Sequence, residues 1–249
     1  MAEVRHLNNA PITEAIIDFR VKLPSEFKVE TFLELKNTIG DRFPKVEDRK
    51  LFSSQFGIKK GEPQPPSAKY HGVQGYFFKP EADKKVAQFR IDGFTFSRLK
   101  PYTNWEEMFD EARELWGMYC EIAQPEAVTR LAARYINHIN IPLPIDDLSD
   151  YFTASPKIPE NVQGVISGFL SKVVVYDQEL DVATNIVQAL EKSTKPDKYI
   201  TVVLDIDSFK TGDFYANNGE MWEIFANLRN IKNQIFFSSI TDETARLFE

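Results

Sequence analysis

Cysteine is almost absent from this chain of 249 residues, and histidine is scarce. The single cysteine, Cys120, excludes a disulfide within the chain. His6, His71 and His138 lie far apart and fit no zinc-ligand spacing. The HExxH, CxxC and EF-hand patterns are missing as well. The common metal-site signatures are therefore excluded.

The sequence also lacks the glycine-rich patterns that bind phosphate and the motifs that present a nucleophile. It contains no GxxxxGK[ST], GxGxxG or GxSxG segment. Cys120 lies toward the end of an amphipathic stretch, where a lone cysteine more often packs in the core than attacks a substrate. We can assign no catalytic residue, we expect no cofactor, and the balance favours a protein that is not an enzyme.

Long apolar runs are absent too. Val173, Val174 and Val175 are bounded by Lys172 and Asp177, far short of the ~20 apolar residues that cross a bilayer. The first residues are charged where a secretion signal needs an apolar segment. We therefore expect a cytoplasmic protein.

Positive charge is in short supply, and its distribution is uneven. The net charge is −7, with 18 Lys and Arg against 13 Asp and Glu in residues 1–100 and 12 against 24 in residues 101–249. An acidic chain repels polyanions. Nucleic acids and membranes are therefore disfavoured as partners.

Alternating and helical patterns fill the first half of the chain. Residues 12–22 alternate as a strand with one wet face, and residues 29–39 show helical spacing up to Gly40. Three β runs follow at about 51–60, 69–78 and 86–99, and we expect a bulge or bend at Gly93 in the last. A capping box formed by Thr103 and Glu106 then predicts a helix.

The second half shows a similar order. Residues 131–141 alternate as a strand, a short helical turn follows near 148–152, and β runs are expected near 162–176, 179–190 and 198–209 before a long helix. The 179–190 segment also fits a helical period, so strand and helix both stay open there.

These patterns predict an α+β fold made of two similar units, each a strand, a helix, three strands and a long helix. We expect one two-lobed domain with units at 1–125 and 126–249. The antiparallel sheets are expected to form a saddle or incomplete barrel around the long helices.

The densest polar cluster lies on the strand near 131–141. Arg134 and His138 alternate there with Asn137, offering a bidentate cation and amide groups to an anion or a partner's backbone. A cross-strand network that fixes strand register is the more economical interpretation. We also expect Arg98 and Arg134 to face one groove, with Glu14 as an internal partner.

Two further carboxylates, Asp205 and Asp207, share one face of a strand and could hold a divalent cation, with Glu14 as a third carboxylate around it. A solvated strand face explains them more simply. The interpretation as a metal site remains a weak alternative.

Four segments resemble a sporadically distributed prokaryotic family of proteins of roughly this length and of unknown function. They span nearly the whole chain and are residues 7–19, 93–105, 134–137 and 236–241. The resemblance implies an intracellular protein, accessory or defence-linked, and it transfers no catalytic residue.

We therefore expect a non-enzymatic binding or regulatory module that recognises a protein partner or a small ligand in a groove between its lobes. The alternative is a metal-dependent enzyme acting on a phosphorylated or nucleotide-like substrate, in which Arg98 or Arg134 would clamp the phosphate. A toxin-neutralising protein is a third hypothesis. The sequence does not indicate an oligomeric state.

Overall fold

The computed structural model describes residues 1–249 except 56–57, 60–61, 64–66, 83, 194 and 217–218. Its strands are β1 Ile12–Lys22, β2 Lys45–Gln55, β3 Ile58–Lys59, β4 Glu62–Pro63, β5 Ser67–Lys79, β6 Lys85–Arg90, β7 Gly93–Leu99, β8 Ala127–Pro142, β9 Leu170–Asp177, β10 Val182–Glu191 and β11 Tyr199–Phe214. Its α-helices are α1 Lys36–Ile39, α2 Trp105–Ala123, α3 Glu220–Ser239 and α4 Asp242–Arg246, and the 3₁₀ segments are η1 Val29–Leu35 and η2 Leu148–Asp150.

One antiparallel sheet of nine strands dominates the molecule, in the order β2-β5-β6-β7-β1-β8-β11-β10-β9. β1 and β8 join the two halves of the chain, since they pair from Ile12 opposite Asn137 to Lys22 opposite Ala127. β3 and β4 form a separate two-stranded sheet. No helix in the described part of the chain is long and apolar enough to cross a membrane.

The prediction of an α+β fold with two repeated units around long helices is wrong. The sheet is open and continuous, with β2 and β9 at its two ends, and it encloses no helix. The two halves of the chain also contribute different numbers of strands to this sheet. The first half supplies β2, β5, β6, β7 and β1, and the second half supplies β8, β11, β10 and β9. The physical reason is that the backbone hydrogen bonds of the long β1–β8 pairing continue one open sheet from the first half of the chain into the second, with the helices on one face.

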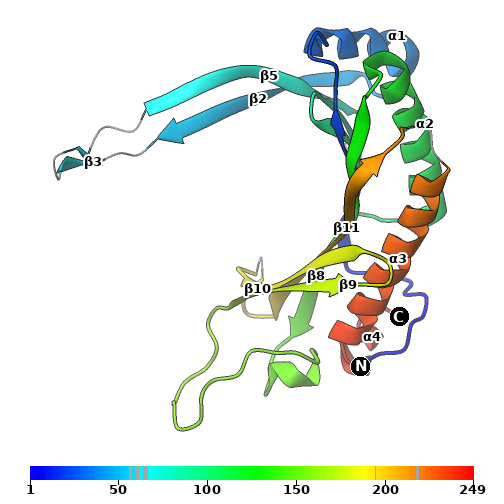
Figure 1. Ribbon diagram of the computed structural model, residues 1–249. Coiled ribbons are helices and arrows are strands. Elements are labelled where there is room, and N and C mark those ends of the chain that lie inside the picture. Colours follow the sequence, from blue (N-terminus) through cyan, green and yellow to red (C-terminus); the bar gives the residue numbers. More distant parts are fainter. Residues whose placement is uncertain (56–57, 60–61, 64–66, 83, 194, 217–218) are drawn as a thin grey trace.

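The helices cover only one face of this curved sheet. α2 and α3 lie against its convex side in Figure 1, and its concave side is open. Trp116 of α2 stacks on Phe19 of β1 with ring centroids 4.1 Å apart, and Phe225 of α3 lies 5.0 Å from the same ring. The core therefore fills the space between sheet and helices.

The alternation of β1 explains its two faces. Ala15, Ile17 and Phe19 are fully buried on the helix side. Because successive strand residues point to opposite faces, Glu14, Asp18 and Arg20 lie on the open side. This alternation places charged residues in the middle of a wide sheet.

The predicted run at 86–99 is a hairpin rather than a single bulged strand. β6 and β7 pair from Lys85 opposite Arg98 to Arg90 opposite Gly93, with a turn at Ile91 and Asp92. Gly93 has φ of +148°, and a Cβ there would lie 1.9 Å from the carbonyl oxygen of Phe19. The glycine is required by close approach of β1, which the sequence pattern does not reveal.

Most other predicted elements are present. The run expected near 162–176 is a strand only from Leu170 onward, in β9, and the helical segment expected at 29–39 consists of the 3₁₀ segment η1 and one turn of α1. The 179–190 segment is strand β10, and the strands expected at 12–22 and 131–141 are β1 and β8. The run at 51–60 corresponds to β2 and β3 in part, although residues 56–57 and 60 lie outside the described residues. The expected turn between prolines contains η2.

Candidate functional site

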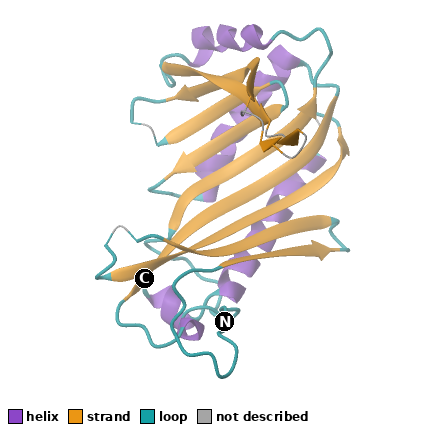
Figure 2. Ribbon diagram, turned by 90° about the vertical axis from the view of Figure 1, so that its left-hand side faces the viewer, coloured by secondary structure: helices purple, strands orange, loops and turns teal. Residues whose placement is uncertain are grey.

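The open face of the sheet carries a groove of about 530 Å³. Figure 2 looks onto this face, with the helices behind it. The groove crosses β6, β7, β1, β8 and β11, and its lining is rich in charge. Its charged residues are Glu14, Asp18, Arg20, Arg90, Arg130, Arg134 and Asp207.

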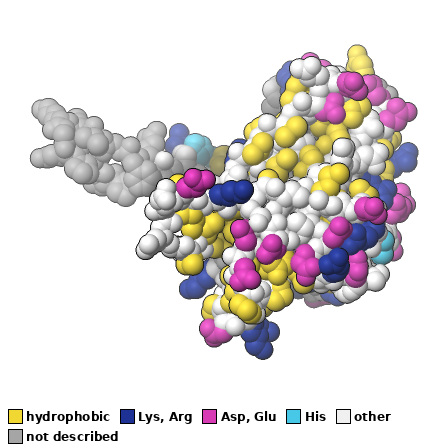
Figure 3. Space-filling view, turned by 90° about the horizontal axis from the view of Figure 1, so that it is seen from below, with side chains coloured by type: hydrophobic (Ala, Val, Ile, Leu, Met, Phe, Trp, Pro, Cys, Tyr) yellow, Lys and Arg dark blue, Asp and Glu magenta, His cyan; other side chains and the backbone are white. Residues whose placement is uncertain are grey.

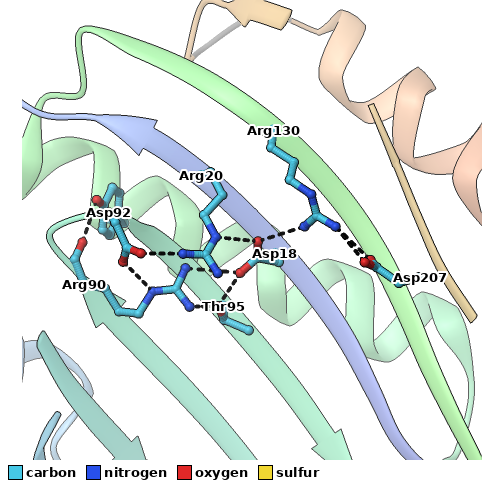
Figure 4. A network of polar contacts seen from close by, with 8 residues as sticks. Asp18, Arg20, Arg90, Asp92, Thr95, Arg130 and Asp207 are labelled. Carbon is cyan, nitrogen blue, oxygen red and sulfur yellow. Dashed lines mark hydrogen bonds and ion pairs between the residues drawn. The ribbon is translucent and has the colours of Figure 1, made fainter. Parts of the chain in front are cut away.

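Asp18 is the centre of the groove floor and is buried. Its Oδ1 accepts hydrogen bonds from Thr95 Oγ1 at 2.6 Å and Arg90 Nη2 at 3.1 Å. Its Oδ2 contacts Arg20 Nε at 3.1 Å and Arg130 Nη1 at 3.3 Å. Figure 4 shows these four side chains converging on the carboxylate. Every lone-pair region of Asp18 is occupied, which is the condition for burying a carboxylate at moderate cost.

The same network continues to both sides of Asp18. Asp92 accepts from Arg90 Nε at 2.9 Å and also pairs with Arg20. Arg130 Nη2 donates to both oxygens of Asp207 at 2.9 and 2.8 Å. Asn185 Nδ2 of β10 donates to Asp207 at 3.3 Å. Polar contacts therefore link six adjacent strands, from β6 to β10. Figure 4 shows the part of this network between Arg90 and Asp207.

Electrostatics within the network favours the charged form of Asp18. Burial raises the pKa of this carboxyl, but the Arg90, Arg20 and Arg130 charges and the Thr95 hydrogen bond together hold it below its ordinary value. Asp18 is thus an anion at neutral pH, although it is buried. The network is a structural ion-pair ladder that fixes the register of the central strands.

The candidate residues on the open face have different surroundings. Arg134 forms a bidentate pair with Asp205, at 2.9 Å from Nε to Oδ1 and 2.6 Å from Nη2 to Oδ2. His138 Nδ1 lies 3.4 Å from Glu191 Oε2, and both side chains are well exposed. Glu14 lines the groove without an ion pair or hydrogen bond to any described residue. Arg134 therefore contacts Asp205 instead of the expected Glu14.

Arg98 and Asn137 lie on the other face of the sheet. Ala15 is paired with both Arg98 and Tyr135, whereas Arg134 is opposite Ile16. Arg98 and Arg134 consequently point to opposite faces and cannot share a groove. Asn137 is buried on the helix side, where its Nδ2 donates to the Leu204 carbonyl at 2.9 Å.

Asp205 and Asp207 share one face of β11, as their spacing requires, but each forms an ion pair with an arginine. Each carboxylate accepts a two-pronged contact, from Arg134 and Arg130 respectively. Across the residues that the structure describes, no group of three or more His, Cys, Asp or Glu side chains is placed to hold a metal ion. A cation would have to displace a guanidinium at either position.

The sequence analysis overlooked the second polar centre, which lies on the helix side. Lys232 of α3 is buried, and its Nζ lies 3.6 Å from the centroid of the Tyr135 ring. It lines a cavity of about 330 Å³ together with Asn137, Arg229 and Tyr102. A signal was available, because Lys232 interrupts the apolar stripe of Phe225, Leu228 and Phe236 at a core position.

Comparison with known proteins adds no relative. No family model matches the chain, and no curated protein matches its sequence. The resemblance to a prokaryotic family of unknown function therefore stays a prediction.

Proposed function

We propose that the protein is a binding module that recruits a protein partner by adding an extended segment of that partner to β9. The two ends of the nine-stranded sheet support this proposal. β2 has the sequence KVEDRKLFSSQ, with five charged residues in its first six positions, whereas β9 has LSKVVVYD. Charges on an edge strand discourage pairing with other chains, and β9 has only Lys172 and Asp177, one on each side of its apolar run.

Side chains of β9 are exposed on both faces. Leu170, Val173, Val174, Val175 and Tyr176 are 75%, 51%, 59%, 45% and 57% exposed. β9 pairs only with β10, so within the described chain its outer backbone groups have no strand partner. A contiguous apolar edge of this kind is typical of binding by strand addition, in which backbone hydrogen bonds give affinity and alternate side chains give specificity.

The distribution of charge favours a protein partner over a polyanion. On the open face the guanidinium groups of the ladder are already paired with carboxylates. Figure 3 shows acidic side chains spread over the lower face of the molecule, with basic ones among them. A nucleic acid needs a surplus of cations along one surface.

The test is a peptide-library selection against the wild-type protein, with matched variants as controls. We expect selected peptides with alternating apolar residues to bind with micromolar affinity and to protect β9 amides from hydrogen exchange. Val174→Lys should weaken binding at least tenfold. Val162 is 59% exposed, as Val174 is, but lies in a loop, so Val162→Lys should bind as wild type does.

Two results would contradict the proposal. One is equal binding to wild type and Val174→Lys, which would place the peptide elsewhere. The other is a wild-type dimer that becomes monomeric in Val174→Lys, because the edge would then be filled by a second copy of this chain. Light scattering on both proteins distinguishes these results.

A further inference from the structure

The cavity around Lys232 is separate from the open face and from β9. It lies between the N-terminal segment, the start of α2, β8 and α3. At about 330 Å³ it is within the range of small-ligand sites. Its size and its position on the helix side make it a site of its own.

Lys232 is the unusual group in this cavity. Its residue is 8% exposed, and in the described part of the chain it has no carboxylate or hydrogen-bond partner. Its ammonium lies over the face of the Tyr135 ring, 3.6 Å from Nζ to the centroid. A buried ammonium without an anion is costly, and a ring face offsets only part of that cost.

The carboxylates around the cavity pair with other cations and not with Lys232. Arg229 pairs with Glu106 at 2.9 Å. Arg5 pairs with the carboxylates of Asp242 and Glu249 at 3.3 and 2.7 Å. Glu106 is the single carboxylate among the lining residues, and Arg229 engages it. Lys232 is therefore the lining cation that no carboxylate of the described residues contacts.

Aromatic side chains form the rest of the wall. Tyr102 and Tyr135 meet edge to face, with their hydroxyl oxygens 3.3 Å apart. Trp105, Phe236 and Phe237 also line the cavity. The combination of one buried cation with an aromatic wall is complementary to a molecule that has one charged end and an apolar body.

We infer that this cavity binds a small organic carboxylate, whose anionic end contacts Lys232 and whose apolar body packs against Tyr102, Trp105 and Phe236. The anion would supply the partner that the chain itself does not give Lys232. Asn137 and Asn233, which also line the cavity, add amide groups near the same ligand.

This site has a built-in pH dependence. Burial and the nearby Arg229 lower the pKa of Lys232 to about 7. The groups that face it from other elements are Tyr135 of β8, Tyr102 before α2, Glu106 of α2, and Arg5 and His6 of the N-terminal segment. A carboxylate prefers the protonated amine, so its affinity should fall as pH rises through this range.

The experiment is calorimetric titration of the full chain with two matched pairs of probes, benzoate against benzamide and hexanoate against hexanamide. We expect at least one carboxylate to bind saturably, one per chain, and its amide to bind at least tenfold more weakly. Affinity should drop about thirtyfold between pH 6 and pH 8.5, because the protonated fraction of an amine with a pKa of about 7 falls by that factor. Lys232→Met should lose carboxylate binding, and Lys157→Met, at an exposed position, should retain it.

A second measurement needs no variant of the cavity. Acetylation of wild-type lysines, followed by mass spectrometry, should show that the bound carboxylate slows reaction at Lys232 and leaves Lys157 unchanged. The inference is overturned if neither carboxylate binds saturably, if the amides bind equally well, or if Lys232 is not protected. Loss of peptide binding at β9 would not affect this result, because the two sites share no residue.

Discussion

Asp18 shows how a single residue can hold the middle of a wide sheet. Replacing it with Asn keeps the size of the side chain but removes the charge that three guanidinium groups share. Arg90 is 4% exposed and would lose its buried anion. We expect Asp18→Asn to lower the free energy of unfolding by about 3–5 kcal/mol, as measured by urea denaturation.

Glu14 provides the matched control, because it lies on the same face of β1 without an ion pair to a described residue. Glu14→Gln should change stability by less than about 0.5 kcal/mol. The low pKa of Asp18 also sets the direction of pH dependence. The stabilisation by the Asp18 carboxylate is present above its unfolded pKa and is lost as pH falls through the lower folded pKa. The free energies of unfolding of wild type and Asp18→Asn should therefore become equal in acid.

Residue identities in the polar sites were only partly predictable. The sequence analysis singled out Arg134, Asp205 and Asp207. In the structure Arg134 pairs with Asp205, and Asp207 pairs with Arg130. It did not recognise Arg90 as part of the ladder, because Arg90 lies 72 positions from Asp18. Contacts at such separation depend on which strands become neighbours, and local periodicity carries no information on that.

At the scale of elements, α2 is the clearest agreement between pattern and structure. The helix expected after residue 103 is present, and its Trp105, Leu115 and Trp116 are buried. The helix begins at Trp105, and its cap is Asn104, whose Oδ1 accepts from the Glu107 amide at 2.8 Å. The expected Thr103–Glu106 capping box is thus shifted by one residue, because Asn104 is itself a strong capping residue.

Trp116 packs α2 against β1 through its contact with Phe19. We expect Trp116→Ala to lower the free energy of unfolding by about 3–5 kcal/mol, since it removes a ring that stacks on Phe19 and is 2% exposed. Urea denaturation measures the change. Glu121→Ala, on the exposed side of the same helix, should cost less than about 0.5 kcal/mol. A loss below about 1 kcal/mol at Trp116 would show that α2 contributes little to the core.

At the scale of the whole molecule, Lys232 should make stability depend on pH. Its folded pKa of about 7 is below the ordinary value of 10.5. Between these values the unfolded chain binds the extra proton, so stability should rise with pH, by at most about 1.4 kcal/mol per unit. We expect wild type to gain stability from pH 7 to 9 relative to Lys232→Met, as measured by urea denaturation without added carboxylate.

Lys157→Met serves as the control in this series, because it removes an exposed lysine that lies outside the cavity. It should follow the wild-type pH profile. Parallel profiles for wild type and Lys232→Met would show that the Lys232 ammonium reaches water in the folded protein. That outcome would also remove the electrostatic basis of the cavity's preference for anions.

The sequence by itself determined most of the strands and helices, because the two-residue and 3.6-residue periods of apolar side chains are local properties. It also determined that the chain lacks the common metal-site signatures. The low count of cysteine and histidine is enough for that conclusion.

Only the tertiary structure decided the order of the strands and the assembly of the sites. Two repeated units and one continuous sheet predict similar local patterns, and the β1–β8 pairing selects the second. The same pairing places Arg130 beside Asp18, 112 positions apart in the chain, and sends Arg98 and Arg134 to opposite faces. Strand order is set by burial and by backbone hydrogen bonds between distant segments, which no local pattern specifies.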